Sequence, residues 1–137
     1  MANLTAARED FRQDGELVLY PVKGSTKLYK GSIVAIDTGG YAVKGADTAN
    51  YRFAGIAYET VDNTGADGAK TIRCWRKGVF ELNTPDTATQ ASVGKLVYIS
   101  DDNNVALAAT TTNDVVVGEV TEFVSASKLR VDIGRRV

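Results

Sequence analysis

A short segment of this chain occurs twice, and this repeat restricts the possible fold more than any other feature of the sequence. Residues 30–36 (Lys-Gly-Ser-Ile-Val-Ala-Ile) are matched 63 positions later by residues 93–99 (Val-Gly-Lys-Leu-Val-Tyr-Ile). In each copy a second glycine follows the first after 24 positions. A repeat at a fixed period indicates that one structural unit is used twice. We therefore expect two similar halves, at about 16–78 and 79–137.

The ungapped alignment of residues 30–61 with residues 93–124 shows what the two copies share. Nine of the 32 aligned pairs are identical, and in the first copy they are Gly31, Val34, Ile36, Ala46, Thr48, Asn50, Gly55, Glu59 and Val61. The polar residues beside the glycines differ between the copies, whereas the glycines and the apolar positions return. The four glycines with expected structural roles are Gly31, Gly55, Gly94 and Gly118.

Short apolar segments separated by turn residues predict an all-β fold. The expected strands are 17–20, 32–37, 41–43, 52–59, 71–75, 78–82, 95–100, 105–107, 115–122 and 128–133. This spacing is typical of a compact β-barrel or β-sandwich. Two equivalent sheets packed about a pseudo-twofold axis, or closed into one barrel, would bury both apolar faces. Residues 61–69 are expected to form a loop, and Thr84 is expected to cap a short helical turn.

The first 15 residues differ in character from the rest of the chain. They are polar and rich in alanine, and their larger apolar side chains, Leu4 and Phe11, are seven positions apart. A helix this short is marginal in water unless it packs on a partner surface. Two interpretations remain open, a frayed terminus or an arm that orders on a neighbouring subunit or partner. We therefore divide the chain into an N-terminal arm, 1–15, and a single β domain, 16–137.

Composition argues against several classes of function. The net charge of −1 is unlike that of proteins that bind nucleic acid through a basic surface. The chain has no histidine, which is the commonest general base and metal ligand. Cys74 is the single cysteine, which fits a small buried residue in a protein made in a reducing compartment. We expect no catalysis, no cofactor, no metal site and no nucleic-acid or membrane partner.

Trp75 is the main candidate for a contact with a partner. On the predicted strand 71–75 it faces away from Ile72 and Cys74, and arginines stand on both sides of it. An outward-facing tryptophan beside arginines is typical of an interface anchor. Stacking on the surface without a partner is the equally open alternative. The candidate interface residues are Arg73, Trp75 and Arg76.

The glycine and strand motifs together resemble those of a family of small tailed-phage and prophage head proteins, the capsid decoration or cement proteins. The matching motifs are Gly31-Ser-Ile-Val, Phe53-Ala-Gly-Ile-Ala, Arg76-Lys-Gly-Val-Phe, Gly94-Lys-Leu-Val-Tyr and Val117-Gly-Glu. The likeness extends from about residue 16 to residue 137.

This resemblance implies a protein that binds the outside of an assembled shell of major capsid protein and stabilises it. It also implies a trimer near local threefold positions, made in the host cytoplasm and located on the exterior of the virion. The N-terminal arm would engage the shell, and its candidate contact residues are Leu4, Arg8, Phe11 and Arg12. Two alternatives stay open, a β-barrel module that binds polysaccharide or peptide, and a structural component of a phage tail or baseplate.

Overall fold

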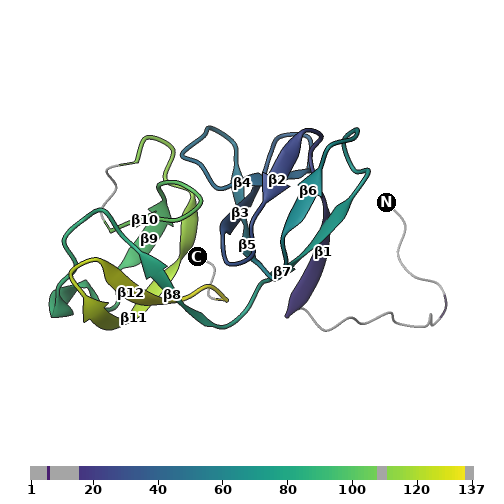
Figure 1. The fold of residues 1–137 in the computed structure, drawn as a ribbon. Coiled ribbons are helices and arrows are strands. Elements are labelled where there is room, and N and C mark those ends of the chain that lie inside the picture. Colours follow the sequence, from purple (N-terminus) through teal and green to yellow (C-terminus); the bar gives the residue numbers. More distant parts are fainter. Residues whose placement is uncertain (1–5, 7–15, 108–110, 135–137) are drawn as a thin grey trace.

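The computed structural model describes residue 6, residues 16–107 and residues 111–134. Within these residues, twelve strands and one turn of 3-10 helix make up the regular structure, which confirms the expected all-β class (Figure 1). The strands are β1 (Leu17–Pro21), β2 (Thr26–Leu28), β3 (Ile33–Ile36), β4 (Ala42–Lys44), β5 (Arg52–Ala57), β6 (Val61–Asn63), β7 (Thr71–Trp75), β8 (Val79–Asn83), β9 (Leu96–Ile99), β10 (Val105–Ala106), β11 (Val116–Ser125) and β12 (Lys128–Asp132). The helical turn η1 covers Gln90–Ser92.

Ten of these strands form two five-stranded antiparallel sheets. The first sheet has the order β1-β7-β5-β3-β4, and the second has the order β8-β12-β11-β9-β10. The strand order is the same in the two sheets, because β7, β5 and β3 of the first sheet are the counterparts of β12, β11 and β9 of the second. The sheets lie side by side in Figure 1, with the second sheet to the left. Residues 17–75 and 79–132 therefore have the same sheet topology.

The first glycine of each repeat begins the same turn in both halves. Gly31 and Gly94 have φ angles of 86° and 89°, in the region that favours glycine. The Gly31 amide donates a hydrogen bond to the carbonyl oxygen of Ala57 over 2.9 Å, and the Gly94 amide donates to that of Val120 over 2.8 Å. Each turn thus ties the start of a central strand to the strand beside it.

The second glycine of each repeat lies where two backbones approach closely. The pairing of β5 with β3 shifts register beside Gly55, and the pairing of β11 with β9 shifts register beside Gly118. A Cβ atom on Gly55 would overlap the carbonyl oxygen of Trp75, and one on Gly118 would overlap that of Asp132. Glycine is required at both positions because another residue would push two strands apart.

The buried apolar side chains form two clusters, one on each face of the first sheet. The larger cluster lies between the two sheets and includes Ile33, Ala35, Phe53 and Ile56 from the first half and Leu82, Val97, Ile99, Val117, Val120, Leu129, Val131 and Ile133 from the second. The smaller cluster contains Val22, Leu28, Val34, Ala42, Ala54, Ala57, Ile72 and Cys74. Both faces of the first sheet are therefore buried.

Equivalent residues of the two sheets belong to different clusters, and this shows how the halves pack. Val34 lies in the smaller cluster, whereas its counterpart Val97 lies in the larger one. Conversely, Ile33 is buried in the larger cluster, whereas its counterpart Leu96 is only half-buried. The two sheets thus meet through faces that are not equivalent. The face of the first sheet that carries Ile33 packs against the face of the second sheet that carries Val97. A pseudo-twofold axis would bury equivalent residues against each other, so this one of the two alternatives for the arrangement of the sheets is wrong.

A two-stranded ribbon of β2 and β6 covers the face of the first sheet that points away from the second sheet (Figure 1). Val61–Asn63 pair with Thr26–Leu28, so the expected loop at 61–69 is wrong for its first three residues. Asn63 is 1% exposed, and its side-chain amide donates to the carbonyl oxygens of Val22 and Ala66. The shorter connection between β11 and β12 leaves no room for an equivalent ribbon in the second half.

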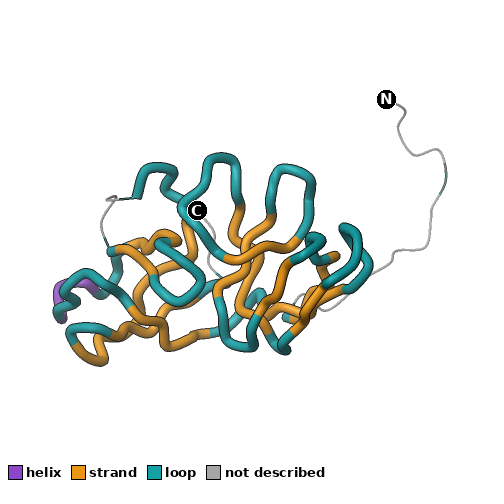
Figure 2. The backbone as a smooth tube through the Cα atoms, turned by 45° about the horizontal axis from the view of Figure 1, so that its top comes forward, coloured by secondary structure: helices purple, strands orange, loops and turns teal. Residues whose placement is uncertain are grey.

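The helical turn in the segment that joins the halves in sequence lies later in the chain than expected. Figure 2 shows it at the far left end of the molecule. Thr84 does not cap it, because the amide of Thr84 donates to the carbonyl oxygen of Ser127 and its hydroxyl accepts from the amide of Asp86. These bonds hold Thr84 beside the β11–β12 turn, and the chain bends at residues 85 and 86. The turn forms at Gln90–Ser92 instead, with Thr89 at its start.

Candidate functional site

The single cysteine of the chain lies in the core and not at a surface site. Cys74 is fully buried, and burial raises the pKa of its thiol to about 12. A thiol that stays protonated at neutral pH is a poor nucleophile. Within residues 16–107 and 111–134, no three His, Cys, Asp or Glu side chains are grouped so that they could hold a metal ion. The same part of the chain has no helix long and apolar enough to cross a membrane.

Trp75 is half-buried, and its ring packs against the larger core cluster. The ring meets that of Tyr58 in an edge-to-face contact, with 5.3 Å between the centroids and an angle of 70°. As predicted, Trp75 faces away from the cluster that holds Ile72 and Cys74. The face it occupies is itself covered by the second half, however, so only part of the indole is available to a partner.

Arg73 is held in a fixed position by Glu59. The carboxylate accepts bonds from the Arg73 backbone amide and from Nε, both over 3.0 Å, and from Nη2 over 3.3 Å. These hydrogen bonds lower the pKa of Glu59 below its usual value and raise the pKa of Arg73. The guanidinium also lies over the Tyr58 ring, 4.9 Å from its centroid. Arg73 is thus oriented before any partner arrives.

These side chains form one continuous surface with a strongly exposed leucine. Leu19 is 56% exposed and lies opposite Arg73 in the pairing of β1 with β7. Tyr58 is 37% exposed. We call Leu19, Tyr58, Glu59, Arg73 and Trp75 the Trp75 surface. The sequence prediction missed Leu19 and Tyr58, although the two-residue alternation of the edge strand β1 could have placed Leu19 on the same face as Arg73.

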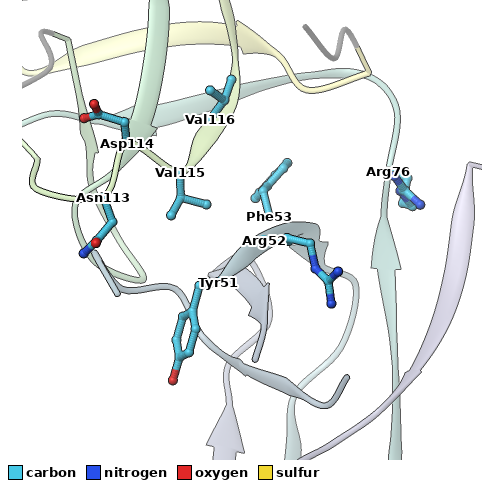
Figure 3. Close-up of a pocket in the computed structure, with 8 residues that line it drawn as sticks. All are labelled: Tyr51, Arg52, Phe53, Arg76, Asn113, Asp114, Val115 and Val116. Atoms are coloured by element: carbon cyan, nitrogen blue, oxygen red, sulfur yellow. The ribbon is translucent and has the colours of Figure 1, made fainter. Parts of the chain in front are cut away.

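Arg76 belongs to a different site. It follows the end of β7 and lines a cleft of about 400 Å³ together with Tyr51, Arg52, Phe53 and residues 113–116 (Figure 3). The cleft lies between residues of the first half and residues of the second. The structure therefore does not bring the three candidate interface residues into one site.

Arg52 is a cleft residue that the sequence prediction missed. A signal was present in the repeat, because the position equivalent to Arg52 in the second copy is Val115. Where one copy has a charged residue and the other has an aliphatic one, the charged side chain is a candidate for a function that only that half performs. The predicted arm residues Leu4, Arg8, Phe11 and Arg12 lie outside the described residues, so their role stays a prediction.

Comparisons with known proteins show what the chain is similar to. A family model described as phage cement protein matches residues 12–134. Among solved structures, the N base of the head fibre gp8.5 of bacteriophage phi29 is similar, with 14% sequence identity and a TM-score of 0.48 over 85% of this chain and 93% of that one. Comparison with curated proteins found no match.

The family match includes every strand of both sheets, from β1 to β12. It therefore describes the whole β fold rather than one motif within it. The family consists of structural proteins of the phage particle, so the partner of this chain is a phage capsid and its place is the virion. We conclude that the chain belongs to the family of phage cement proteins, and its function is the decoration of a phage capsid.

Proposed function

We propose that this protein binds the outside of the assembled shell of major capsid protein and stabilises the shell without catalysis. The match of the phage cement family to residues 12–134 is the observation that carries this proposal. The fold supports it, because two buried clusters and a shared sheet framework make a rigid body that can link neighbouring subunits. Copies gathered as trimers near local threefold positions would add many weak contacts on one shell.

Co-sedimentation with emptied, expanded shells tests the proposed function directly. The protein is expected to pellet with the shells and to raise the denaturant concentration at which the shells dissociate. Imaging of the decorated particles would show whether three copies surround each local threefold position. If the protein stays in the supernatant while the coat protein is intact, the proposed function fails.

The N-terminal arm is proposed to extend the contact with the shell. Deletion of residues 2–14 is expected to weaken shell binding by about tenfold to a hundredfold, the effect of removing one or two buried apolar side chains such as Leu4 and Phe11. The melting temperature should stay nearly unchanged, because every strand of both sheets follows residue 15. A large drop in melting temperature would instead place the segment within the fold.

The Trp75 surface is proposed as a second contact with the shell. Trp75→Ala is expected to cost roughly 2 kcal/mol of folding stability, because the ring is half-buried against the core. Leu19→Ala is the cleaner probe, since the side chain is 56% exposed and its loss should change stability by less than about 0.5 kcal/mol.

The two variants are compared by denaturant unfolding and by shell co-sedimentation. Val79→Ala is the matched control, because Val79 is 55% exposed on an edge strand of the second sheet. Leu19→Ala should weaken shell binding severalfold while Val79→Ala binds like the unmodified protein. Equal binding of both variants would mean that the shell contacts another face.

A further inference from the structure

The cleft between the halves holds two arginines from neighbouring strands of the first sheet. Arg52 begins β5, and Arg76 directly follows β7, which pairs with β5. The backbone of Arg76 is fixed, because its amide donates to the carbonyl oxygen of Glu16 over 2.8 Å. Figure 3 shows the Arg52 side chain next to Phe53 and the Arg76 side chain farther to the right, and residues 113–116 of the second half also line the cleft. The cleft is therefore built by both halves and carries two cationic groups.

Neither of these guanidinium groups has an ion-pair or hydrogen-bond partner within residues 16–107 and 111–134. Two other arginines, Arg73 and Arg130, do have ion-pair partners. Arg73 is paired with Glu59, and Arg130 is paired with Glu122 at the equivalent place in the second half. Asp114, the one acidic residue among the described residues that line the cleft, accepts a 2.7 Å hydrogen bond from the hydroxyl of Thr111. The cleft thus presents an excess of positive charge to solvent.

The sheet framework does not itself require arginine at these two positions. The residue equivalent to Arg52 is Val115, and the residue equivalent to Arg76 is Ile133. Both aliphatic residues are buried in the larger core cluster. The same backbone therefore accommodates apolar side chains there, and the arginines of the first half are free to serve a function other than folding.

The chemistry of the cleft selects for carboxylate groups. A guanidinium presents a planar set of donors that matches a carboxylate in two parallel hydrogen bonds. The half-buried ring of Tyr51 adds an apolar wall for the stem of an acidic side chain. Nucleic acid fits less well, because its binding needs a broad basic surface and this chain has a net charge of −1.

We propose that this cleft binds an acidic segment of the major capsid protein, in which one carboxylate pairs with Arg52 and another with Arg76. This inference rests on the proposed function, and it assigns that function a specific binding site. The contact fixes the orientation of the protein on the shell, because residues of both halves form the cleft and neither half can then rotate independently of it.

The first test uses the isolated protein and therefore does not depend on the shell. Hexaglutamate is titrated into the protein while NMR follows the side-chain Nε–H signals of the arginines. The signals of Arg52 and Arg76 are expected to shift together, whereas that of Arg73, which is already paired, stays in place. Absence of a shift overturns the proposal. So does a larger response of the same signals to duplex DNA, which would make the cleft a polyanion site.

The second test replaces each arginine by the residue that the other copy of the repeat carries. The double variant Arg52→Val, Arg76→Ile is expected to keep its fold and to bind expanded shells about a hundredfold less tightly, about tenfold for each lost charge-assisted pair. The control double variant, Lys44→Val with Lys95→Ile, removes the same charge from two exposed positions.

The control should bind shells within about threefold of the unmodified protein, because Lys44 and Lys95 do not line the cleft and unpaired surface charges elsewhere contribute little. Tight binding by the arginine double variant, or equal loss in both double variants, overturns the proposal. If the unmodified protein itself fails to bind shells, the proposed function fails, while the hexaglutamate titration still decides whether the cleft binds carboxylates.

Discussion

A Gly55→Ala variant is expected to lose most of its folded population. The added Cβ atom would overlap the carbonyl oxygen of Trp75 and lie 3.3 Å from the Cβ atom of Cys74. Both obstacles are fixed, because Cys74 is fully buried and β7 is hydrogen-bonded on both sides. The φ angle of 155° adds backbone strain for any residue other than glycine. The free energy of unfolding of a domain is about 5–15 kcal/mol. A loss of roughly 3–5 kcal/mol would therefore remove much of the stability.

Circular dichroism in a urea series measures the free energy of unfolding of this variant. The repeat offers an equivalent position, Gly118, for a second variant, and Gly31 for a control. Gly118→Ala should also be strongly damaging, because its Cβ would overlap the carbonyl oxygen of Asp132, but without the added strain of a positive φ angle. Gly31→Ala should cost only about 1–2 kcal/mol, since its φ angle is 86° but nothing lies within 4 Å of the added atom. A Gly55→Ala variant as stable as Gly31→Ala would contradict the close approach of the strands.

The equivalence of the two sheets could be predicted because the repeat preserves backbone geometry. Gly31 and Gly94 form the same turn in the two halves. In the last strand, Leu129 and Val131 are two positions apart, and this alternation indicates which face is buried. These features are local, so each can be recognised in a short segment. The β2–β6 ribbon could not be recognised, because its strands are three residues long and lie among turn residues.

The placement of the halves could not be predicted, because the first sheet is buried on both faces. In β5, Phe53 and Ile56 point to the larger cluster while Ala54 and Ala57 point to the smaller one. The strand is apolar from Phe53 to Ala57, so alternation does not tell which face meets the second half. The choice between a twofold arrangement and packing through non-equivalent faces needs the three-dimensional contacts.

The candidate site was only partly predictable for the same reason. Arg73, Trp75 and Arg76 are close in sequence, but Arg76 lies beyond the end of β7 and enters the cleft between the halves. Leu19 and Arg52 are distant in sequence from these residues, and only the strand pairing and the packing of the halves bring them near. Residues that join a site through tertiary packing leave a weak signal in the sequence.

Ile33→Ala is expected to destabilise the protein by about 3–4 kcal/mol, the usual cost of truncating a fully buried aliphatic side chain. Ile33 is 0% exposed and lies in the larger cluster between the sheets. Its amide also donates a 2.8 Å hydrogen bond to the carbonyl oxygen of Asp102 in the second half. The residue is thus at the junction of the halves, and the cavity left by alanine would weaken their mutual packing.

Leu96→Ala is the matched control, because Leu96 occupies the position in β9 that Ile33 occupies in β3. Its side chain is half-buried on the outer face of the second sheet, where no third sheet covers it within the described residues. Its loss should cost only about 1 kcal/mol. Urea unfolding of both variants measures the difference. Halves related by a twofold axis would bury the two positions alike and give equal costs, so unequal costs at equivalent positions are the thermodynamic signature of packing through non-equivalent faces.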